Sequence, residues 1–267
     1  MKNHLYKIKF MNDIITSTSN QITKLINKLF DDKKYRDTSN LFVCQGKKII
    51  TTLISLDFKL DKIIISQNSK YLEKFKYFDN AVVVKKHVYE YMSHQENGDG
   101  LIAVFNKKDK NKNLDYSDNI LVFDNIQNPN NLGAILRTCT AFNIENIILS
   151  NGSVDPYNFK VIQASMGYGL NKNIIYANNL SKIIKDLQTK GYKVYATGFN
   201  KKAVSLQQFD VKRNKIAIIF GNEGSGLKTD QMNLCDQTVY IPINKKVDSL
   251  NLSNAVAIIT YFIKSWK

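Results

Sequence analysis

The sequence has few cysteines and histidines, and neither type stands at the spacing of a metal site. The chain has 267 residues, and its cysteines are Cys44, Cys139 and Cys235. This odd, scattered set argues against a disulfide framework, and the missing Cys/His ligand spacing argues against zinc. The histidines are equally dispersed, at His4, His87 and His94. We therefore expect a reduced, intracellular chain without a metal.

Long hydrophobic runs are also missing. Residues 1–15 mix Lys, Asn and Asp with apolar residues, so they lack the continuous apolar region of a secretory signal. A membrane span needs about 20 predominantly apolar residues, and no such run occurs. These absences favour a cytoplasmic protein with no membrane partner.

Acidic residues are outnumbered, which points to a polyanionic partner. The chain has 23 Asp and Glu against 38 Lys and Arg, a formal net charge of +15. Each phosphate that Lys or Arg neutralises releases counterions, so this excess favours nucleic acid, although a chain that uses Lys for solubility would have the same charge. A hydrophobic share of 43% excludes a disordered chain and is enough for two small cores.

A polar stretch at residues 106–118 divides the chain between two apolar runs. We therefore predict a first domain at residues 1–110, a linker at 111–118 and a second domain at 119–267. In the first domain, expected strands at residues 41–44, 62–66 and 81–84 alternate with helical patterns, which predicts a small α/β domain.

The second domain has a clearer alternation. Its expected strands are residues 120–124, 146–149, 173–176, 193–197, 215–220 and 238–243, and its expected helices include residues 131–142, 180–190 and 251–263. The apolar run at 215–220 is typical of a strand buried on both faces of a parallel sheet. Periodicity alone therefore predicts a parallel α/β sheet, doubly wound and without a knot.

Three unusual loops follow expected strands, at the edge where open α/β sheets bind ligands. In the first, residues 128–137, Asn130 or Asn131 is expected to cap the following helix, and Arg137 lies off its apolar stripe. By spacing alone, Arg137 would be an ordinary solvated arginine. In the third loop, residues 241–255, Ser249 or Asn251 is expected to open the C-terminal helix, and a plain helix cap would explain either residue.

The second loop, residues 221–227, is rich in glycine but is not a P-loop. Leu227 displaces the Lys-Thr pair by one position, which removes the lysine from the phosphates. Glu223 would also place a negative charge in the phosphate cradle. Glycines at these positions still let the backbone approach a ligand closely.

Taken together, the three loops resemble the signature blocks of the SpoU (TrmH) family of RNA ribose 2′-O-methyltransferases, in the SPOUT superfamily. The matching residues are Asn131-x-Gly133-Ala134-x-x-Arg137, Gly221-x-Glu223-Gly224-x-Gly226-Leu227 and Ile241-Pro242-x(6)-Ser249-Leu250-Asn251-x-Ser253-x-Ala255, with Ser165-Met166-Gly167 similar to a smaller block. The resemblance covers residues 119–267 and is fainter at residues 20–46. The sequence departs from it at Asn128, where many relatives have Asp, and at Gln45, where an acidic residue precedes Gly46.

The resemblance implies a fold, a cofactor and partners. It implies a SPOUT-type parallel sheet with a deep trefoil knot, preceded by a small α/β RNA-binding domain, and a homodimer. The implied cofactor is S-adenosylmethionine, held by Gly221, Ile241 and Leu250, with Thr197 and Gly198 nearby. The implied substrate is RNA, with 23S rRNA favoured over tRNA, and the reacting hydroxyl would be surrounded by Asn131, Arg137, Glu223, Ser249 and Asn251.

Arg137 can be assigned two roles. The family proposal makes it the base, yet a guanidinium keeps its proton below about pH 12. We therefore favour a role in which Arg137 orients an RNA phosphate and stabilises the developing alkoxide. Two alternatives to an RNA methyltransferase stay open: a catalytically silent RNA-binding protein of the same fold, and an enzyme acting on small nucleotides.

Overall fold

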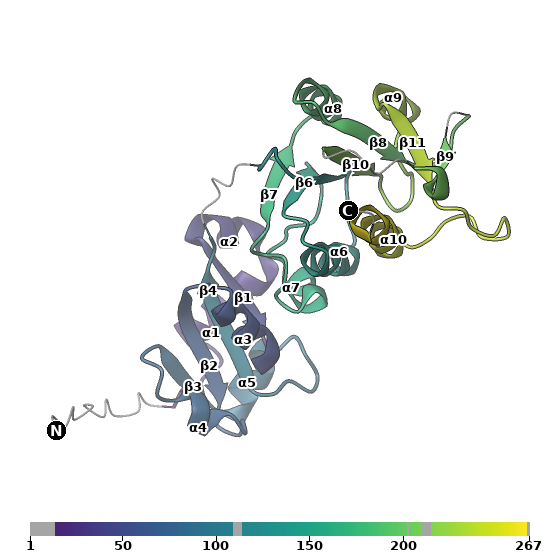
Figure 1. The fold of residues 1–267 in the computed structure, drawn as a ribbon. Helices are drawn as coiled ribbons and strands as arrows, with labels where there is room; N and C mark the ends of the chain where they lie inside the picture. The colour runs from purple at the N-terminus through teal and green to yellow at the C-terminus, as the bar shows by residue number, and fades with distance from the viewer. Residues whose placement is uncertain (1–13, 109–113, 202, 210–214, 266–267) are drawn as a thin grey trace, which may run out of the picture. The chain divides into compact units, whose positions relative to one another are not determined.

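The computed structural model describes residues 14–108, 114–201, 203–209 and 215–265 (Figure 1). The chain forms two compact units, Met1–Lys107 and Lys108–Lys267. The expectations made for residues 1–13 and for the first part of the predicted linker, residues 111–113, lie outside the described residues.

The first unit is an α/β structure, as its alternating pattern predicts. Its strands are β1 (Leu41–Gln45), β2 (Leu60–Ser66), β3 (Ala81–Val84) and β4 (Leu101–Asn106), and its helices are α1 (Gln21–Asp31), α2 (Lys33–Ser39), α3 (Lys47–Ser55), α4 (Leu72–Phe75) and α5 (Lys86–Met92). The sheet has the order β1-β4-β2-β3, in which β4 is antiparallel to both neighbours and β2 is parallel to β3. The three predicted strands are confirmed, and β4 coincides with the apolar run at residues 101–105.

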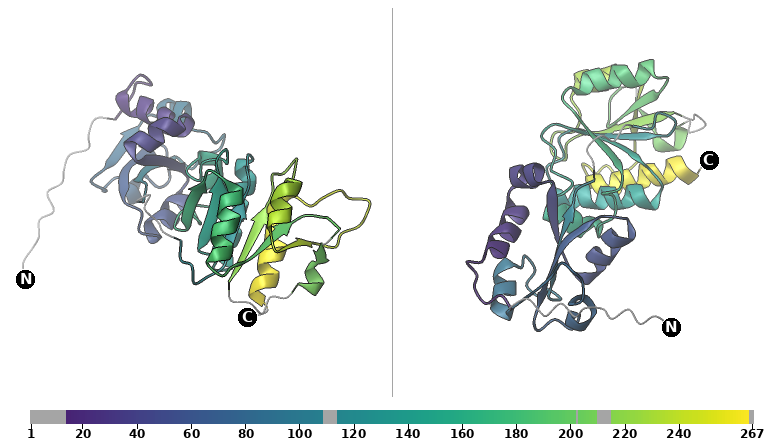
Figure 2. Two further views of the ribbon diagram at one scale, coloured as in Figure 1. Left: turned by 90° about the horizontal axis from the view of Figure 1, so that it is seen from above. Right: turned by 90° about the vertical axis from the view of Figure 1, so that its left-hand side faces the viewer.

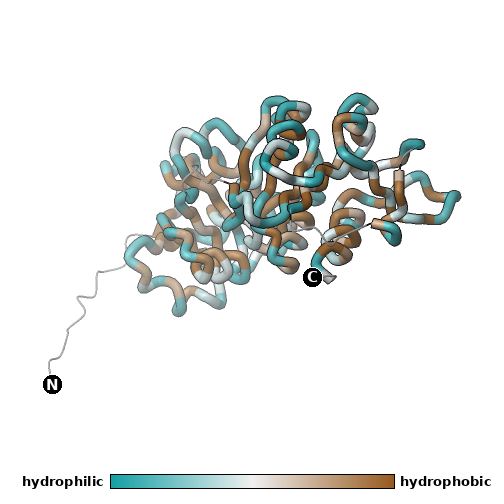
Figure 3. The backbone as a smooth tube through the Cα atoms, turned by 45° about the horizontal axis from the view of Figure 1, so that its top comes forward, coloured by the Kyte–Doolittle hydropathy of each residue, from teal (hydrophilic) through white to brown (hydrophobic). Residues whose placement is uncertain are grey.

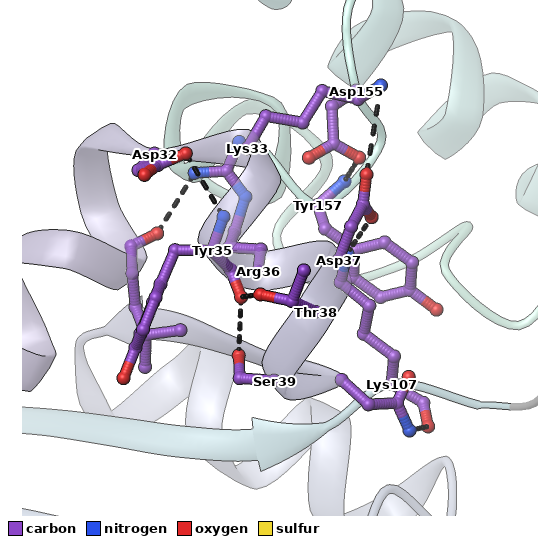
Figure 4. Close-up of polar contacts among 12 residues, drawn as sticks. Asp32, Lys33, Tyr35, Arg36, Asp37, Thr38, Ser39, Lys107, Asp155 and Tyr157 are labelled. Carbon is purple, nitrogen blue, oxygen red and sulfur yellow. Dashed lines mark hydrogen bonds and ion pairs between the residues drawn. The ribbon is translucent and has the colours of Figure 1, made fainter.

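Local hydrogen bonds set the bounds of α2 (Figure 4). The Asp32 side chain accepts a hydrogen bond from the Tyr35 backbone N–H at 3.0 Å and so caps its first turn. Asn40 ends the helix in the left-handed conformation, with φ of 55°. Lys107 then ties the chain after β4 to this helix, because its Nζ lies 2.8 Å from Asp37 Oδ1 and its side chain is only 2% exposed. Removal of either side chain would therefore break a salt bridge that is largely buried on the lysine side.

The second unit is a parallel α/β sheet, and this prediction is confirmed. Its strands are β5 (Ile120–Phe123), β6 (Asn146–Ser150), β7 (Asn173–Ala177), β8 (Lys193–Thr197), β9 (Val204–Ser205), β10 (Ile216–Phe220) and β11 (Gln237–Tyr240). Its helices are α6 (Pro129–Ala141), α7 (Phe159–Ser165), α8 (Leu180–Thr189), α9 (Thr229–Leu234) and α10 (Leu252–Ser265), with a short 3-10 helix at Leu206–Gln208. The strand order is β7-β6-β5-β10-β8-β11-β9, and every neighbouring pair is parallel.

Helices cover both faces of this sheet (Figure 2). Alternate residues of β5 point to opposite faces, so Leu121 and Phe123 join the core under α6, α7 and α10, whereas Ile120 and Val122 join the core under α8 and α9. In Figure 3 the hydrophobic residues, in brown, gather in the inner parts of the tube, and the hydrophilic ones, in teal, gather at its outer turns. Such two-sided burial explains the continuous apolar strand sequences.

The strand order brings distant segments of the chain together. β10 lies between β5 and β8, although these three strands are far apart in the sequence, and β11 follows on the outer side of β8. The carboxyl ends of β5, β10, β8 and β11 therefore lie next to one another, and so do the loops that leave them. The trefoil knot that the resemblance implies stays a prediction.

The last predicted strand is too long. It was expected at residues 238–243, but β11 ends at Tyr240 because Pro242 has no backbone N–H to continue a ladder.

No helix of the described residues is long and apolar enough to cross a membrane.

Candidate functional site

A cavity of about 1030 Å³ lies at the carboxyl edge of the second sheet. Its walls come from the ends of β8, β10 and β11, from the loops that follow these strands, and from the starts of α6 and α10. Nine of the ten predicted site residues line it: Asn131, Thr197, Gly198, Gly221, Glu223, Ile241, Ser249, Leu250 and Asn251. The three sequence loops therefore meet in one place.

Three polar side chains from separate loops form a connected cluster, which we call the amide–carboxylate cluster. Asn131 Nδ2 donates a hydrogen bond to Glu223 Oε1 at 3.0 Å. Asn251 Nδ2 donates to Asn131 Oδ1 at 3.0 Å. Asn131 is only 7% exposed, so this central amide uses both its donor and its acceptor inside the protein.

The glycine-rich loop at 221–227 is shaped by the side chain of Asn222. Asn222 Oδ1 accepts hydrogen bonds from the backbone N–H groups of Gly224 (2.9 Å) and Ser225 (3.2 Å). Its Nδ2 donates to the Asn125 carbonyl at 2.7 Å, which ties the loop to the end of β5. Sequence reasoning missed Asn222. The signal was available, because an Asn in a glycine-rich loop is a common turn former that bonds its own backbone.

Gly221 permits a close approach within this loop. A Cβ atom at this position would overlap backbone atoms of Gly226 and Leu227. Gly226 itself has φ of +65° and its backbone N–H donates to the Asn222 carbonyl at 2.9 Å. The loop therefore folds back on itself and presents Glu223 at the cavity, where its carboxylate is exposed.

The helix caps differ in part from expectation. Neither Asn130 nor Asn131 caps α6: the cap is Asn128, whose side chain accepts from the Asn130 backbone N–H at 2.9 Å. The reason is Pro129, which occupies the first helical position, so the residue before it becomes the cap. Asn131 is thus free to bridge Glu223 and Asn251. The expectation for the C-terminal helix is confirmed, since Asn251 Oδ1 accepts from the Ser253 backbone N–H at 2.9 Å.

The inner wall of the cavity is apolar. Phe220, Val239 and Ile259 line it and are at most 2% exposed. In the same cavity, Thr197 Oγ1 donates to the Ile219 carbonyl at 3.0 Å, which joins the ends of β8 and β10. A buried apolar floor with a polar cluster at one side suits a ligand that has both a flat apolar part and a charged or hydroxyl end.

Arg137 is not part of this cavity. It lies six residues after Asn131 in α6, its side chain is exposed, and it is absent from the cavity lining. The structure thus brings Asn131, Glu223, Ser249 and Asn251 together and leaves Arg137 apart from them. Its assigned role stays a prediction.

The cysteines provide no nucleophile. Burial raises the pKa of the Cys139 thiol, on the apolar face of α6, to about 12. Burial also raises the pKa of Cys235 to about 12. Both thiols are therefore protonated at neutral pH.

The described residues contain no group of three or more His, Cys, Asp or Glu that could hold a metal ion.

Comparison with known protein families gives two matches along the chain. Residues 118–261 match the SpoU rRNA Methylase family, and residues 20–103 match the MRM3-like substrate binding domain. The first match contains every residue of the cavity that the motifs singled out. The second falls within the first structural unit.

Individual proteins are similar over most of the chain. The 23S rRNA (guanosine(2553)-2′-O)-methyltransferase RlmP of Bacillus subtilis is 24% identical over 250 residues, which cover 94% of this chain and 98% of that protein. The 23S rRNA (guanosine-2′-O-)-methyltransferase RlmB of Acinetobacter baylyi is 33% identical over 164 residues, 59% of this chain and 64% of that protein. The crystal structure of AdoMet-bound rRNA methyltransferase from Sinorhizobium meliloti superposes with a TM-score of 0.81 at 25% identity, covering 94% of this chain and 97% of that one.

Proposed function

The chain belongs to the SpoU rRNA methylase family, and on that premise we propose that it methylates a ribose 2′-hydroxyl of 23S rRNA. It is an RNA 2′-O-methyltransferase that uses S-adenosylmethionine. The observation that carries the assignment is the convergence of the three family motifs on one cavity. The choice of 23S rRNA over tRNA is supported by the names of the relatives RlmP and RlmB.

The cavity fits the cofactor chemically. Its buried apolar wall, with Phe220 and Ile259, matches an adenine ring, and its volume is near the upper limit for small-molecule sites. The exposed carboxylate of Glu223 gives the polar side a negative charge, which is complementary to a sulfonium. We propose that Gly221, Ile241 and Leu250 hold the cofactor, with Thr197 and Gly198 at the neighbouring strand end.

S-adenosylmethionine supplies an electrophilic methyl group, and the protein must hold a ribose hydroxyl in line with it. We assign this task to the amide–carboxylate cluster. The Asn131 amide is fixed by Glu223 on one side and Asn251 on the other, so it cannot rotate freely. Ser249 lines the same cavity and offers a hydroxyl. Such a fixed set of donors and acceptors costs no reorganisation when the hydroxyl reacts.

Arg137 would act on the RNA rather than on the cofactor. Its exposed side chain is available to a phosphate, in keeping with an orienting role. A guanidinium also remains charged at neutral pH, so it can stabilise an alkoxide without giving up its proton.

The first domain, residues 1–110, is assigned to RNA binding, followed by a linker at 111–118 and the methyltransferase domain at 119–267. The match of residues 20–103 to a substrate-binding domain supports this division.

We also propose a homodimer. It is supported by two exposed apolar side chains on α10, Ile258 (41%) and Tyr261 (61%). The cytoplasmic location stays a prediction.

A methyl-transfer assay tests the function. Full-length protein is incubated with radiolabelled S-adenosylmethionine and RNA from cells that lack the gene, and the modified nucleoside is identified. We expect label on a ribose 2′-oxygen, in the 23S fraction. Label in tRNA would redirect the substrate, and tight RNA binding without any label would support the silent RNA-binding alternative.

Glu223→Gln separates catalysis from folding. The change keeps an acceptor for Asn131 but removes the charge, so we expect kcat to fall by about 10-fold or more, by analogy with the loss of one catalytic hydrogen-bonding group. Because Glu223 is exposed, the melting temperature should hardly change. Asp186→Asn, an exposed carboxylate on α8, is the matched control and should retain activity. Equal kcat for Glu223→Gln and the wild type would remove Glu223 from the site.

A further inference from the structure

An exposed aromatic ring stands at the rim of the cavity. Phe199 follows β8 directly after Gly198, lines the cavity, and is 78% exposed. It is the most exposed large hydrophobic side chain among the described residues. A phenylalanine in water gains nothing from the hydrophobic effect, so this position needs a reason other than packing.

The ring is held in place rather than left loose. Its centroid lies 5.3 Å from that of Tyr240, with the planes at 79°. The residue before Phe199 is held to β11, because the Gly198 backbone N–H donates to the Val239 carbonyl at 3.1 Å. The residue after it is also held to β11, because Asn200 Nδ2 donates to Thr238 Oγ1 at 2.8 Å. Phe199 is thus presented at the rim by two attachments to β11, with most of its surface open.

The cofactor does not account for this ring. An adenine has the buried inner wall available, whereas Phe199 lies at the open side of the cavity. Two exposed lysines accompany the ring, Lys245 in the cavity lining and Lys201 two residues after it. An exposed aromatic face beside positive charges is the usual combination for single-stranded RNA, in which bases stack on the ring and phosphates meet the lysines.

We propose that Phe199 is a positioning residue on which a nucleobase of the substrate RNA stacks, at or beside the nucleotide whose ribose enters the cavity. Stacking would fix the nucleotide while the amide–carboxylate cluster orients its hydroxyl. Because every base has a stacking face, this contact contributes affinity and position more than sequence choice. The inference rests on the proposed function.

Kinetics of the full-length protein on 23S rRNA provide the first test. Phe199→Ala should raise KM for RNA by about 10-fold, within the range expected for one lost stacking contact. KM for S-adenosylmethionine and the melting temperature should stay unchanged. Phe199→Trp and Phe199→Tyr should restore KM, and Phe199→Leu should not, because leucine keeps the apolar volume without the flat ring. Tyr176→Ala is the control, since Tyr176 is 45% exposed on the opposite edge strand β7.

Several results would overturn the proposal. Activity of Phe199→Leu equal to wild type would show that apolar bulk is sufficient. A rise in KM for S-adenosylmethionine alone would assign the ring to adenine. A change of molecular mass in sedimentation, with RNA kinetics unchanged, would assign it to contact with a second copy.

A fluorescence measurement keeps the inference separate from the proposed function. A short single-stranded oligoribonucleotide that carries 2-aminopurine loses fluorescence when that base stacks on an aromatic ring. We expect quenching with the wild type and Phe199→Trp and none with Phe199→Ala, whether or not methyl transfer occurs. Equal quenching by Phe199→Ala would refute the stacking role, and quenching without methyl transfer would refute only the proposed activity.

Discussion

Asn131, in the first motif, connects the second and third motifs because an amide has both a donor and an acceptor. Its Nδ2 donates to Glu223 and its Oδ1 accepts from Asn251, and both bonds are 3.0 Å long. A carboxylate in its place could accept from Asn251 but could not donate to Glu223. The hydrogen bonds of the site therefore need an amide at position 131, and a carboxylate of the same size cannot replace it.

Asn131→Asp should make stability depend on pH. Two carboxylates would face each other, so the pKa of one of them would rise above its unfolded value. A carboxyl whose pKa is higher in the folded state favours folding while it is protonated, at low pH. This contribution to stability is lost as the pH rises and the carboxyl ionises. We expect the variant to be close to wild type near about pH 4 and less stable by about 1–3 kcal/mol near about pH 7. Denaturant unfolding at several pH values measures this.

Asn130→Asp is the control for that series. Asn130 is exposed and lies in the same first turn of α6, so a new carboxylate there gains the same helix-dipole benefit without facing Glu223. Its stability should change little with pH over this range. A similar pH dependence in both variants would argue against a direct Asn131–Glu223 contact.

At the scale of elements, the glycine-rich loop depends on Gly221. We expect Gly221→Ala to abolish measurable binding of S-adenosylmethionine, because the new Cβ would force the backbone of Gly226 and Leu227 away from its place. Gly224→Ala is the matched change: its Cβ would lie 3.5 Å from Asn222 Oδ1, an ordinary contact. Isothermal titration calorimetry should therefore show a much smaller loss for Gly224→Ala. Equal losses would show that the loop fails for a reason other than this close approach.

A strand that is buried on both faces of the sheet was predictable from the sequence, because it reads as a continuous apolar run. β10 is buried at every position, and the continuous apolar run at residues 215–220 predicted it with an error of one residue. β9 is only two residues long, too short for any periodic pattern, and it was missed. The cap of α6 was misplaced by two or three residues, although the Asn-Pro pair at 128–129 contained the signal.

At the scale of the whole molecule, the strand order could not be derived from periodicity. The insertion of β10 between β5 and β8 depends on contacts between segments nearly a hundred residues apart, such as Asn222 Nδ2 with the Asn125 carbonyl. Periodicity reports which face of an element is buried and is silent about its neighbours. The meeting of the loops was therefore expected from the motif resemblance, and the contacts within the amide–carboxylate cluster required coordinates.

The net charge of +15 predicts that RNA binding depends strongly on salt concentration and that S-adenosylmethionine binding does not. RNA binding that neutralises about three phosphates should weaken by roughly 40-fold between about 50 and about 200 mM salt, because counterions are released on binding. S-adenosylmethionine has no phosphate and sits in a cavity, so its dissociation constant should change by less than about twofold over the same range. Fluorescence anisotropy with labelled RNA and calorimetry with the cofactor measure the two constants under identical conditions. A flat salt response for RNA would mean that the lysines of this chain serve solubility and do not bind phosphates.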